Sequence, residues 1–140
     1  MVKTVTLSIR GQQSYPGQDP DVIELVTEGT LEDIVDGWKL CYEESDLTGL
    51  AGVSTTFQIQ GKTVTLIRTG KLNSQMVFQE GIPHDSLYQM EFGALMLTVC
   101  AVKVETNLTD AGGVIDLKYT IEVEQNAAGM IDYHLDIKTK

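Results

Sequence analysis

The residues best placed to do chemistry are a carboxylate and a guanidinium, those of Glu44 and Arg68. Side chains alternate between the two faces of a strand, and this alternation puts Glu44 and Tyr42 on one inward face and Arg68 on another. A buried charge needs a partner. One interpretation is a structural ion pair that fixes the neighbouring loop. Another is a ligand anchor, in which Arg68 binds a carboxylate or phosphate and Tyr42 and Tyr119 are further donors. A third is that one of the two charges simply lies in water.

Other chemical groups give weaker signals. Glu43 and Glu44 are adjacent, so on a strand they point to opposite faces and cannot form an acid/base pair by themselves. Cys41 has no histidine near it in sequence that could activate its thiol. His84 and His134 have no neighbours with metal-ligand spacing, so no metal site is predicted. The Gly-rich, nucleotide-binding and nucleophile-elbow motifs are absent, and no cofactor is predicted.

Composition narrows the class of partner. The chain has 140 residues and a formal net charge of −10. This length predicts one domain, residues 1–140. The acidic balance argues against nucleic acid and anionic membrane surfaces as partners, because both require clustered Lys and Arg. The first residues carry no apolar signal segment, and Cys41 and Cys100 have no redox spacing. We therefore expect a cytoplasmic protein with reduced cysteines.

The elements that must position these groups are strands. Apolar residues alternate with polar ones from Ile23 to Val35, and then comes Asp36-Gly37, a dipeptide that suits a type I′ turn. A two-residue turn at this position pairs Val35 with Trp38 and continues the match of apolar faces away from the turn.

The same test predicts two further hairpins. A tight turn at Gln60-Gly61 joins one pair of strands, and a three-residue loop at 70–72 joins the next. Both keep apolar residues opposite apolar residues. The resulting pairs begin with Ile59 opposite Lys62 and Arg68 opposite Ser74.

The rest of the chain continues in period two, with loops expected at 11–21 and 107–113. Residues 94–104 are apolar on both faces at several points, so the alternation does not assign which of their faces points inward. Eight to ten strands joined as hairpins, with one inward face each, predict an all-β fold, an antiparallel up-and-down β-barrel. Closure also hides the edges of so many strands. The side chains expected in the core near the middle of the chain are Met76, Phe78, Tyr88, Met90 and Phe92. Asp33 is expected to lie in water at a barrel mouth.

Several short motifs resemble the YwiB-like family of small bacterial proteins, in order and spacing along almost the whole chain. They are Tyr42-Glu43-Glu44, Leu47-Thr48-Gly49-Leu50, Thr55-Thr56, Leu66-Ile67-Arg68, Met76-Val77-Phe78, Tyr88 and Gly93. The resemblance implies a barrel of the calycin, lipocalin-like type. It implies no activity.

Three hypotheses of function follow. The first is a non-catalytic barrel that binds a small anionic or apolar molecule. The second is an interaction module that associates with itself through a strand edge or the apolar stretch 94–104, as a homo-oligomer. The third is an enzyme that works from a Glu44/Arg68 site. The first hypothesis predicts that the ligand-binding residues are Trp38, Tyr42, Glu44, Phe57, Leu66, Arg68, Phe78 and Tyr119.

Overall fold

The computed structural model describes residues 2–14, 17, 19–45, 51–90, 93–124 and 126–140. They form ten strands. The described part of the chain has no helix with the length and apolar character that a membrane crossing requires. The strands are β1 (Val2–Ser14), β2 (Asp21–Ile34), β3 (Gly37–Glu43), β4 (Val53–Gln60), β5 (Thr63–Gly70), β6 (Ser74–Phe78), β7 (Pro83–Met90), β8 (Gly93–Thr109), β9 (Gly112–Val123) and β10 (Asn126–Thr139).

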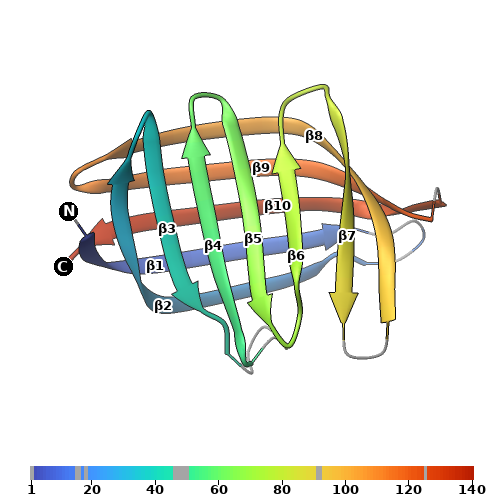
Figure 1. Ribbon diagram of the computed structural model, residues 1–140, viewed down its shortest axis with the longest axis horizontal. Helices are drawn as coiled ribbons and strands as arrows, with labels where there is room; N and C mark the ends of the chain where they lie inside the picture. The colour runs from blue at the N-terminus through green and yellow to red at the C-terminus, as the bar shows by residue number, and fades with distance from the viewer. Residues whose placement is uncertain (1, 15–16, 18, 46–50, 91–92, 125) are drawn as a thin grey trace.

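All ten strands belong to one antiparallel sheet that curls into a nearly closed barrel. The sheet order is β6-β5-β4-β3-β2-β1-β10-β9-β8-β7. Every pair of neighbours in the sheet is consecutive in sequence except β1 and β10. Figure 1 shows β3 to β6 in front, crossing the longer strands β1, β2 and β8 to β10 behind them. The predicted all-β, up-and-down barrel is confirmed.

The ends of the sheet, β6 and β7, meet along a seam with few main-chain hydrogen bonds. Asn73 and Gln89 exchange two of them, with N···O distances of 2.9 and 2.8 Å. The Ser86 hydroxyl also donates to the carbonyl of Gln75. These contacts bring β7 against β6 without the continuous ladder that joins the other neighbouring strands.

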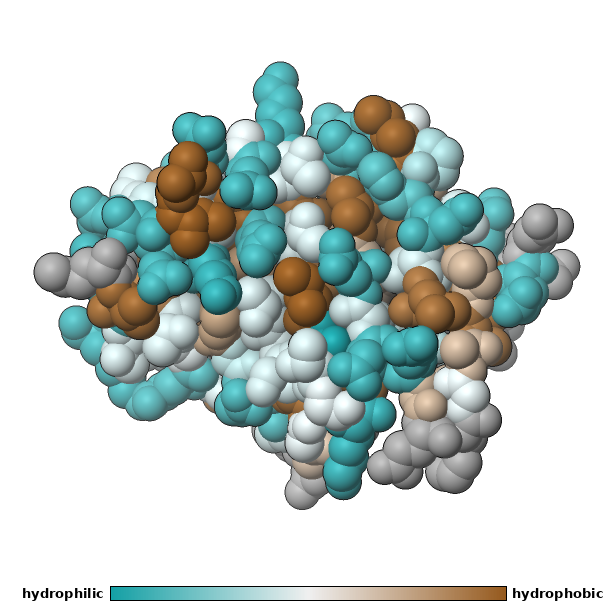
Figure 2. Space-filling model, in the orientation of Figure 1, coloured by the Kyte–Doolittle hydropathy of each residue, from teal (hydrophilic) through white to brown (hydrophobic). Residues whose placement is uncertain are grey.

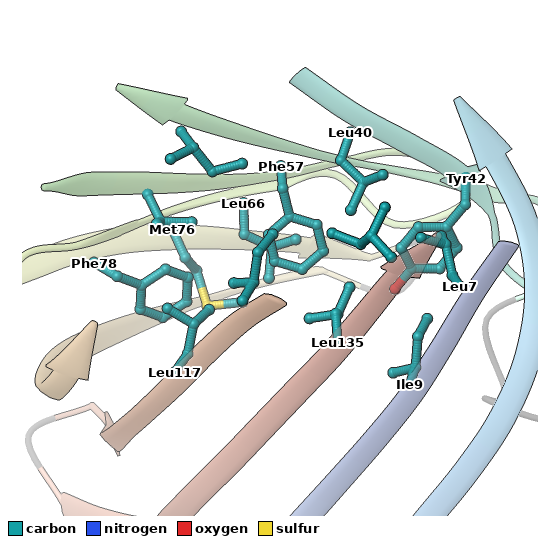
Figure 3. Packing of buried hydrophobic residues seen from close by; sticks show 14 of the residues in the cluster. Leu7, Ile9, Leu40, Tyr42, Phe57, Leu66, Met76, Phe78, Leu117 and Leu135 are labelled. Carbon is teal, nitrogen blue, oxygen red and sulfur yellow. The ribbon is translucent and has the colours of Figure 1, made fainter. Parts of the chain in front are cut away.

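The inward faces of the front and back strands fill the barrel with apolar side chains. Figure 3 shows Leu40, Phe57 and Phe78 from the front strands facing Leu7 and Leu135 from the back. All five are fully buried. These side chains come from strands distant in sequence, and their burial removes apolar surface from water, the main favourable term in folding.

The first hairpin differs from its prediction by two residues. Asp33, not Val35, lies opposite Trp38, and the turn consists of Val35 and Asp36. Asp36 has the positive φ, 61°, and Val35 is 82% exposed at the tip. A shift of two residues keeps every side chain on its predicted face, because the period of a strand is two.

Gly37 explains this shift. It lies within β3, opposite Ile34. A Cβ atom on Gly37 would come within 1.7 Å of the Ile59 carbonyl oxygen on β4. The glycine is therefore needed for close approach of two strands, and the turn lies one residue earlier.

The other two hairpins give one correction and one confirmation. The turn between β4 and β5 consists of Gly61 and Lys62, so Ile59 pairs with Val64 and again keeps its face. The loop between β5 and β6 has the predicted register, with Arg68 opposite Ser74.

Two predicted loops are too long. Residues 11–14 continue β1, and residues 107–109 continue β8 up to a two-residue turn at Asp110 and Ala111. Gly11, Gly112 and Gly113 sit inside strands, where they had suggested loops. Glycine in a strand can mark close backbone approach, and a Cβ atom on Gly113 would come within 1.8 Å of the Asn107 carbonyl oxygen.

The stretch 94–104 has two apolar faces because it contains a bulge. Leu97, Val99 and Ala101 point inward and are buried. The register with β9 shifts between Ala101 and Lys103, so Val102 lies on the outside, 56% exposed, and the inward alternation resumes at Val104.

Replacing Gly37 with alanine tests the close approach of β3 and β4. We expect Gly37→Ala to lower the free energy of unfolding by about 1–3 kcal/mol, the usual cost of overpacking, because the new methyl group meets backbone. Gly11→Ala is the matched control, since its Cβ would meet only Tyr133 ring atoms at 3.6 and 3.7 Å. Urea denaturation measures both; equal stabilities would contradict the assignment.

Candidate functional site

A cavity of about 670 Å³ lies inside the barrel beside the buried core. Its wall is mostly apolar, with a small set of polar groups among the apolar ones. The apolar lining comes from Ile9, Val22, Ile23, Leu25, Met76, Leu95, Leu97, Ile121, Val123 and Ile131, and the polar lining includes Gln13, Asp21, Glu44, Arg68, Tyr88, Tyr119 and Tyr133.

Arg68 supplies the positive charge of the cavity. It lies near the end of β5, between Thr55 on β4 and Ser74 on β6. Its Nε atom is buried and has no hydrogen-bond partner among the residues that the structure describes. Burial lowers the pKa of Arg68, but the oxygens of the surrounding tyrosines and the Glu44 carboxylate more than offset this, so the pKa lies above its ordinary value. The guanidinium is therefore always charged.

Glu44 is held by a hydrogen bond from the neighbouring strand. The Thr55 hydroxyl donates to its carboxylate, with an Oγ1···Oε2 distance of 2.5 Å, and the Thr55 side chain is fully buried. The Glu44 amide donates to the Val53 carbonyl at 2.9 Å. Glu43 points the other way, where Ser54 donates to its carboxylate at 2.7 Å. The two acids thus face opposite sides, as predicted.

Three tyrosines surround the guanidinium and stay un-ionised. The hydroxyl oxygens of Tyr42 and Tyr133 lie 2.8 Å apart. Burial raises the pKa of Tyr42, Tyr119 and Tyr133 above the ordinary value of a phenol. A neutral phenol both donates and accepts a hydrogen bond, so Tyr119 and Tyr133, which line the cavity, can orient a polar ligand atom without adding charge.

Phenylalanine rings of the core hold these tyrosines from behind. Phe57 lies between Tyr42 and Tyr133, with ring centroids 6.5 and 5.9 Å from theirs. Phe78 packs against Tyr119 with a centroid distance of 4.6 Å. Such packed aromatic pairs restrict the motion of both rings, so one end of the core also acts as a rigid floor for the cavity.

The eight residues predicted to bind a ligand occupy three places. Glu44, Arg68 and Tyr119 line the cavity. Tyr42, Phe57, Leu66 and Phe78 are buried in the adjoining core. Trp38 packs at the other end of β3 from Glu44, beside Ile59 and Leu108. Ligand binding by these residues stays a prediction.

Sequence reasoning missed Tyr133, which lines the cavity, and Ser74, which lies outside the lining but beside Arg68. Alternation along β10 signals that Tyr133 faces inward, but no spacing places it against Tyr42, which is 91 residues away. Ser74 is 7% exposed and its Oγ atom has no hydrogen-bond partner among the described residues. The predicted pairing of Ser74 with Arg68 was the sequence signal that places Ser74 beside the guanidinium.

The remaining side chains give mixed outcomes. Asp33 is exposed, as expected for a barrel mouth. Met76 and Phe78 are buried and Tyr88 is half-buried, whereas the prediction that Met90 lies in the core is wrong: it ends β7 and is 41% exposed. Phe92 lies outside the described residues, as do residues 46–50 of the loop after Glu44.

A row of charged side chains crosses the outer face of the barrel. Glu24, Arg10, His134, Asp116 and Glu105 occupy paired positions on β2, β1, β10, β9 and β8. His134 Nδ1 lies 2.5 Å from Asp116 Oδ1, and its Nε2 atom lies 3.1 Å from Asp136 Oδ2. The hydrogen bond to Asp116 is the main cause that raises the pKa of His134. The Asp116 contact joins the consecutive strands β9 and β10, and the sequence analysis did not identify it.

The buried phenols make a prediction for alkaline pH. A raised pKa means that the folded state holds protons that the unfolded state releases above pH ~10. We therefore expect at most two of the five tyrosines to ionise near that pH while the protein stays folded, and stability to fall as pH rises further. Phenolate absorbance recorded with circular dichroism measures this. Ionisation of all five phenols in the folded protein would contradict it.

His134 makes a prediction near neutral pH. Because its folded pKa is raised, its interaction with Asp116 is fully present below the unfolded pKa of ~6.5 and is lost as pH rises through the folded pKa. At about pH 5.5 we expect His134→Gln to lower the melting temperature, with a loss in the free energy of unfolding of less than about 1 kcal/mol. At about pH 9 the substitution should have little effect on either quantity. Asp116→Asn should reduce this pH dependence, and the contact with Asp136 should maintain the remainder; an unchanged dependence would show that Asp116 is not its main source.

Comparison with known proteins gives a family and a fold. The crystal structure of the YwiB protein from Bacillus subtilis superposes on this chain with a TM-score of 0.89. The two share 22% sequence identity, and the match covers 99% of this chain and 93% of the other. At this identity the likeness shows the barrel fold alone. A search of curated proteins finds no match.

The family described as domain of unknown function DUF1934 matches residues 7–137. That range begins in β1 and ends in β10, the first and last strands, which pair with each other to close the sheet. The match, together with the shared fold, supports the YwiB-like resemblance that the sequence motifs carried. The chain belongs to the DUF1934 family, a family of YwiB-like β-barrels.

Proposed function

We propose that this protein binds one small molecule inside the barrel, in the cytoplasm, without catalysing a reaction. The observation that carries the proposal is the cavity of about 670 Å³ with an apolar wall and a few convergent polar groups. Concave, mostly apolar sites of roughly 300–1,000 Å³ with a few placed polar groups are typical of small-molecule sites. The core beside it consists of buried, closely packed apolar side chains, so this hollow is distinct from ordinary packing.

The cavity's polar groups favour binding over catalysis. Catalysis by a carboxylate would need it to act as a base on a nucleophile within reach of a substrate. The carboxylate of Glu44 does contact a hydroxyl, but that hydroxyl belongs to Thr55, whose side chain is fully buried. The phenols of Tyr119 and Tyr133 keep their protons. The cavity can therefore orient a ligand, and the Glu44–Thr55 contact acts as a brace.

The surface supports an internal rather than an external site. Exposed apolar side chains include Val26, Val35, Leu87, Met96 and Val102. On the face shown in Figure 2 such residues form separate brown spots among polar ones. Scattered apolar residues are ordinary on a protein surface, whereas a contiguous patch marks an interface.

The cysteines support the cytoplasm as the compartment. Cys41 and Cys100 are both free thiols. Free thiols are typical of proteins that work where glutathione and thioredoxin keep cysteine reduced.

A dye-binding experiment tests the proposal. The probe is 1-anilinonaphthalene-8-sulfonate, which has an apolar ring system and gains fluorescence in apolar cavities. We expect one dye per protein, and we expect Ile121→Trp to weaken binding at least tenfold, because the indole fills the cavity that Ile121 lines. Val102→Trp is the matched control, since Val102 lies on the outer surface.

Both variants must keep the near-ultraviolet circular dichroism and cooperative unfolding of the unmodified protein. Equal dye affinity in the Ile121→Trp and Val102→Trp variants would place the dye elsewhere and contradict the proposal. Native mass spectrometry of freshly purified protein should in addition show a bound small molecule that Ile121→Trp excludes.

A further inference from the structure

The cavity also carries information on the class of its ligand. We infer that the ligand is a singly charged carboxylic acid with an apolar chain, whose carboxylate rests on Arg68. This inference rests on the proposed function and adds the chemistry of the molecule bound.

The first argument is a pair of unpartnered donors at neighbouring positions. Arg68 Nε and Ser74 Oγ are both buried, and neither has a hydrogen-bond partner among the described residues. Buried polar atoms are almost always hydrogen-bonded, and leaving one unsatisfied is costly. The two residues are directly paired across β5 and β6, and side chains at such positions lie next to each other on one face. Of these two residues, Arg68 lines the cavity, so it is the Arg68 guanidinium for which a ligand can supply an acceptor.

The second argument is the shape of the donor group. The Nε–H of a guanidinium and its neighbouring Nη–H form an edge that binds the two oxygens of a carboxylate in parallel. Here the Nε end of that edge is unused. Glu44, a carboxylate in the same cavity, accepts a hydrogen bond from Thr55. Arg68 thus retains donors for an outside carboxylate.

The third argument sets the charge at one. Glu44 and Asp21 line the same cavity as Arg68. Like charges close together in a site of low dielectric repel strongly. A carboxylate adds one negative charge against the guanidinium, whereas a phosphate monoester carries close to two at neutral pH. The dianion would add repulsion that Arg68 alone does not balance.

The fourth argument describes the remainder of the ligand. Away from Arg68 the wall is formed by Leu25, Leu97, Ile121, Val123 and Ile131. An apolar chain placed against this wall gains free energy by leaving water. The neutral tyrosines of the cavity floor can contact the ligand where its polar head meets its apolar chain, because a tyrosine has an apolar ring and a polar hydroxyl.

A matched set of decyl compounds tests the inference by displacement of the dye and by calorimetry. The probes are decanoate, decanol, decyl phosphate and decyltrimethylammonium, which share one chain length and differ in the head group. We expect decanoate to bind at least tenfold more tightly than decanol and more tightly than decyl phosphate. Decyltrimethylammonium should bind most weakly.

Variants of the head-group site separate charge from chain. Arg68→Met should reduce decanoate affinity at least tenfold and leave decanol affinity unchanged. Arg10→Met is the matched control, because Arg10 is the chain's other arginine and lies on the outer face in an ion pair with Glu24. It should leave all four affinities unchanged. If Arg68→Met unfolds the protein, the four head groups measured on the unmodified protein still decide the outcome.

The outcomes separate this inference from the proposed function. If decanol binds as tightly as decanoate and Ile121→Trp blocks both, the cavity binds small molecules but the carboxylate assignment is wrong. Tightest binding of the cation or the phosphate would overturn the assignment in the same way. If none of the four probes nor the dye binds, the inference and the proposed function both fail.

Discussion

The pairing of the first strand with the last is the interaction on which this barrel depends. β1 and β10 align from Val5 opposite Thr139 to Ser14 opposite Met130. Without it the chain would form two separate meanders, β1 to β6 and β7 to β10, each with an unpaired edge. With it, the edges of the combined sheet fall in the middle of the sequence, at β6 and β7. Contacts this distant in sequence are entropically costly to close, so the apolar core between the front and back strands must supply the compensating free energy.

The candidate site is a continuation of this core rather than an addition to it. Phe57 and Phe78 sit within the packed interior, and the tyrosines packed against them form the cavity floor. The phenol groups therefore reach the cavity from rings that cannot easily move. Arg68 is brought to the same place by the alternation of β5, two residues beyond the buried Leu66. The position of the charge is thus set by strand period and the position of the phenols by aromatic packing.

Strand period explains why much of the architecture could be predicted from the sequence. The inward faces of β3, β5, β9 and β10 follow from alternation, and the loop between β5 and β6 has its predicted register. Both errors in hairpin register are shifts of two residues. Such a shift leaves every side chain on the same face, so the alternation of apolar and polar residues cannot reveal it. At Gly37 the deciding contact is with the Ile59 carbonyl on the next strand, a contact that no turn rule contains. The meeting of Tyr42 with Tyr133 and the division of the interior into filled core and hollow depend likewise on how the barrel closes.

The seam between β6 and β7 is the part of the barrel wall that lacks a continuous ladder of main-chain hydrogen bonds. The Asn73–Gln89 pair and the Ser86 contact to Gln75 tie its two sides together, while every other neighbouring pair of strands shares a ladder. Local opening has the lowest free energy where few hydrogen bonds and contacts must be broken. Met76 on β6 and Tyr88 on β7, one on each side of the seam, both line the cavity. The cavity is already open to solvent where Val22 and Ile23, 46% and 41% exposed, line it. The seam is therefore a second part of its wall, the one that can separate while every other pair of strands stays joined.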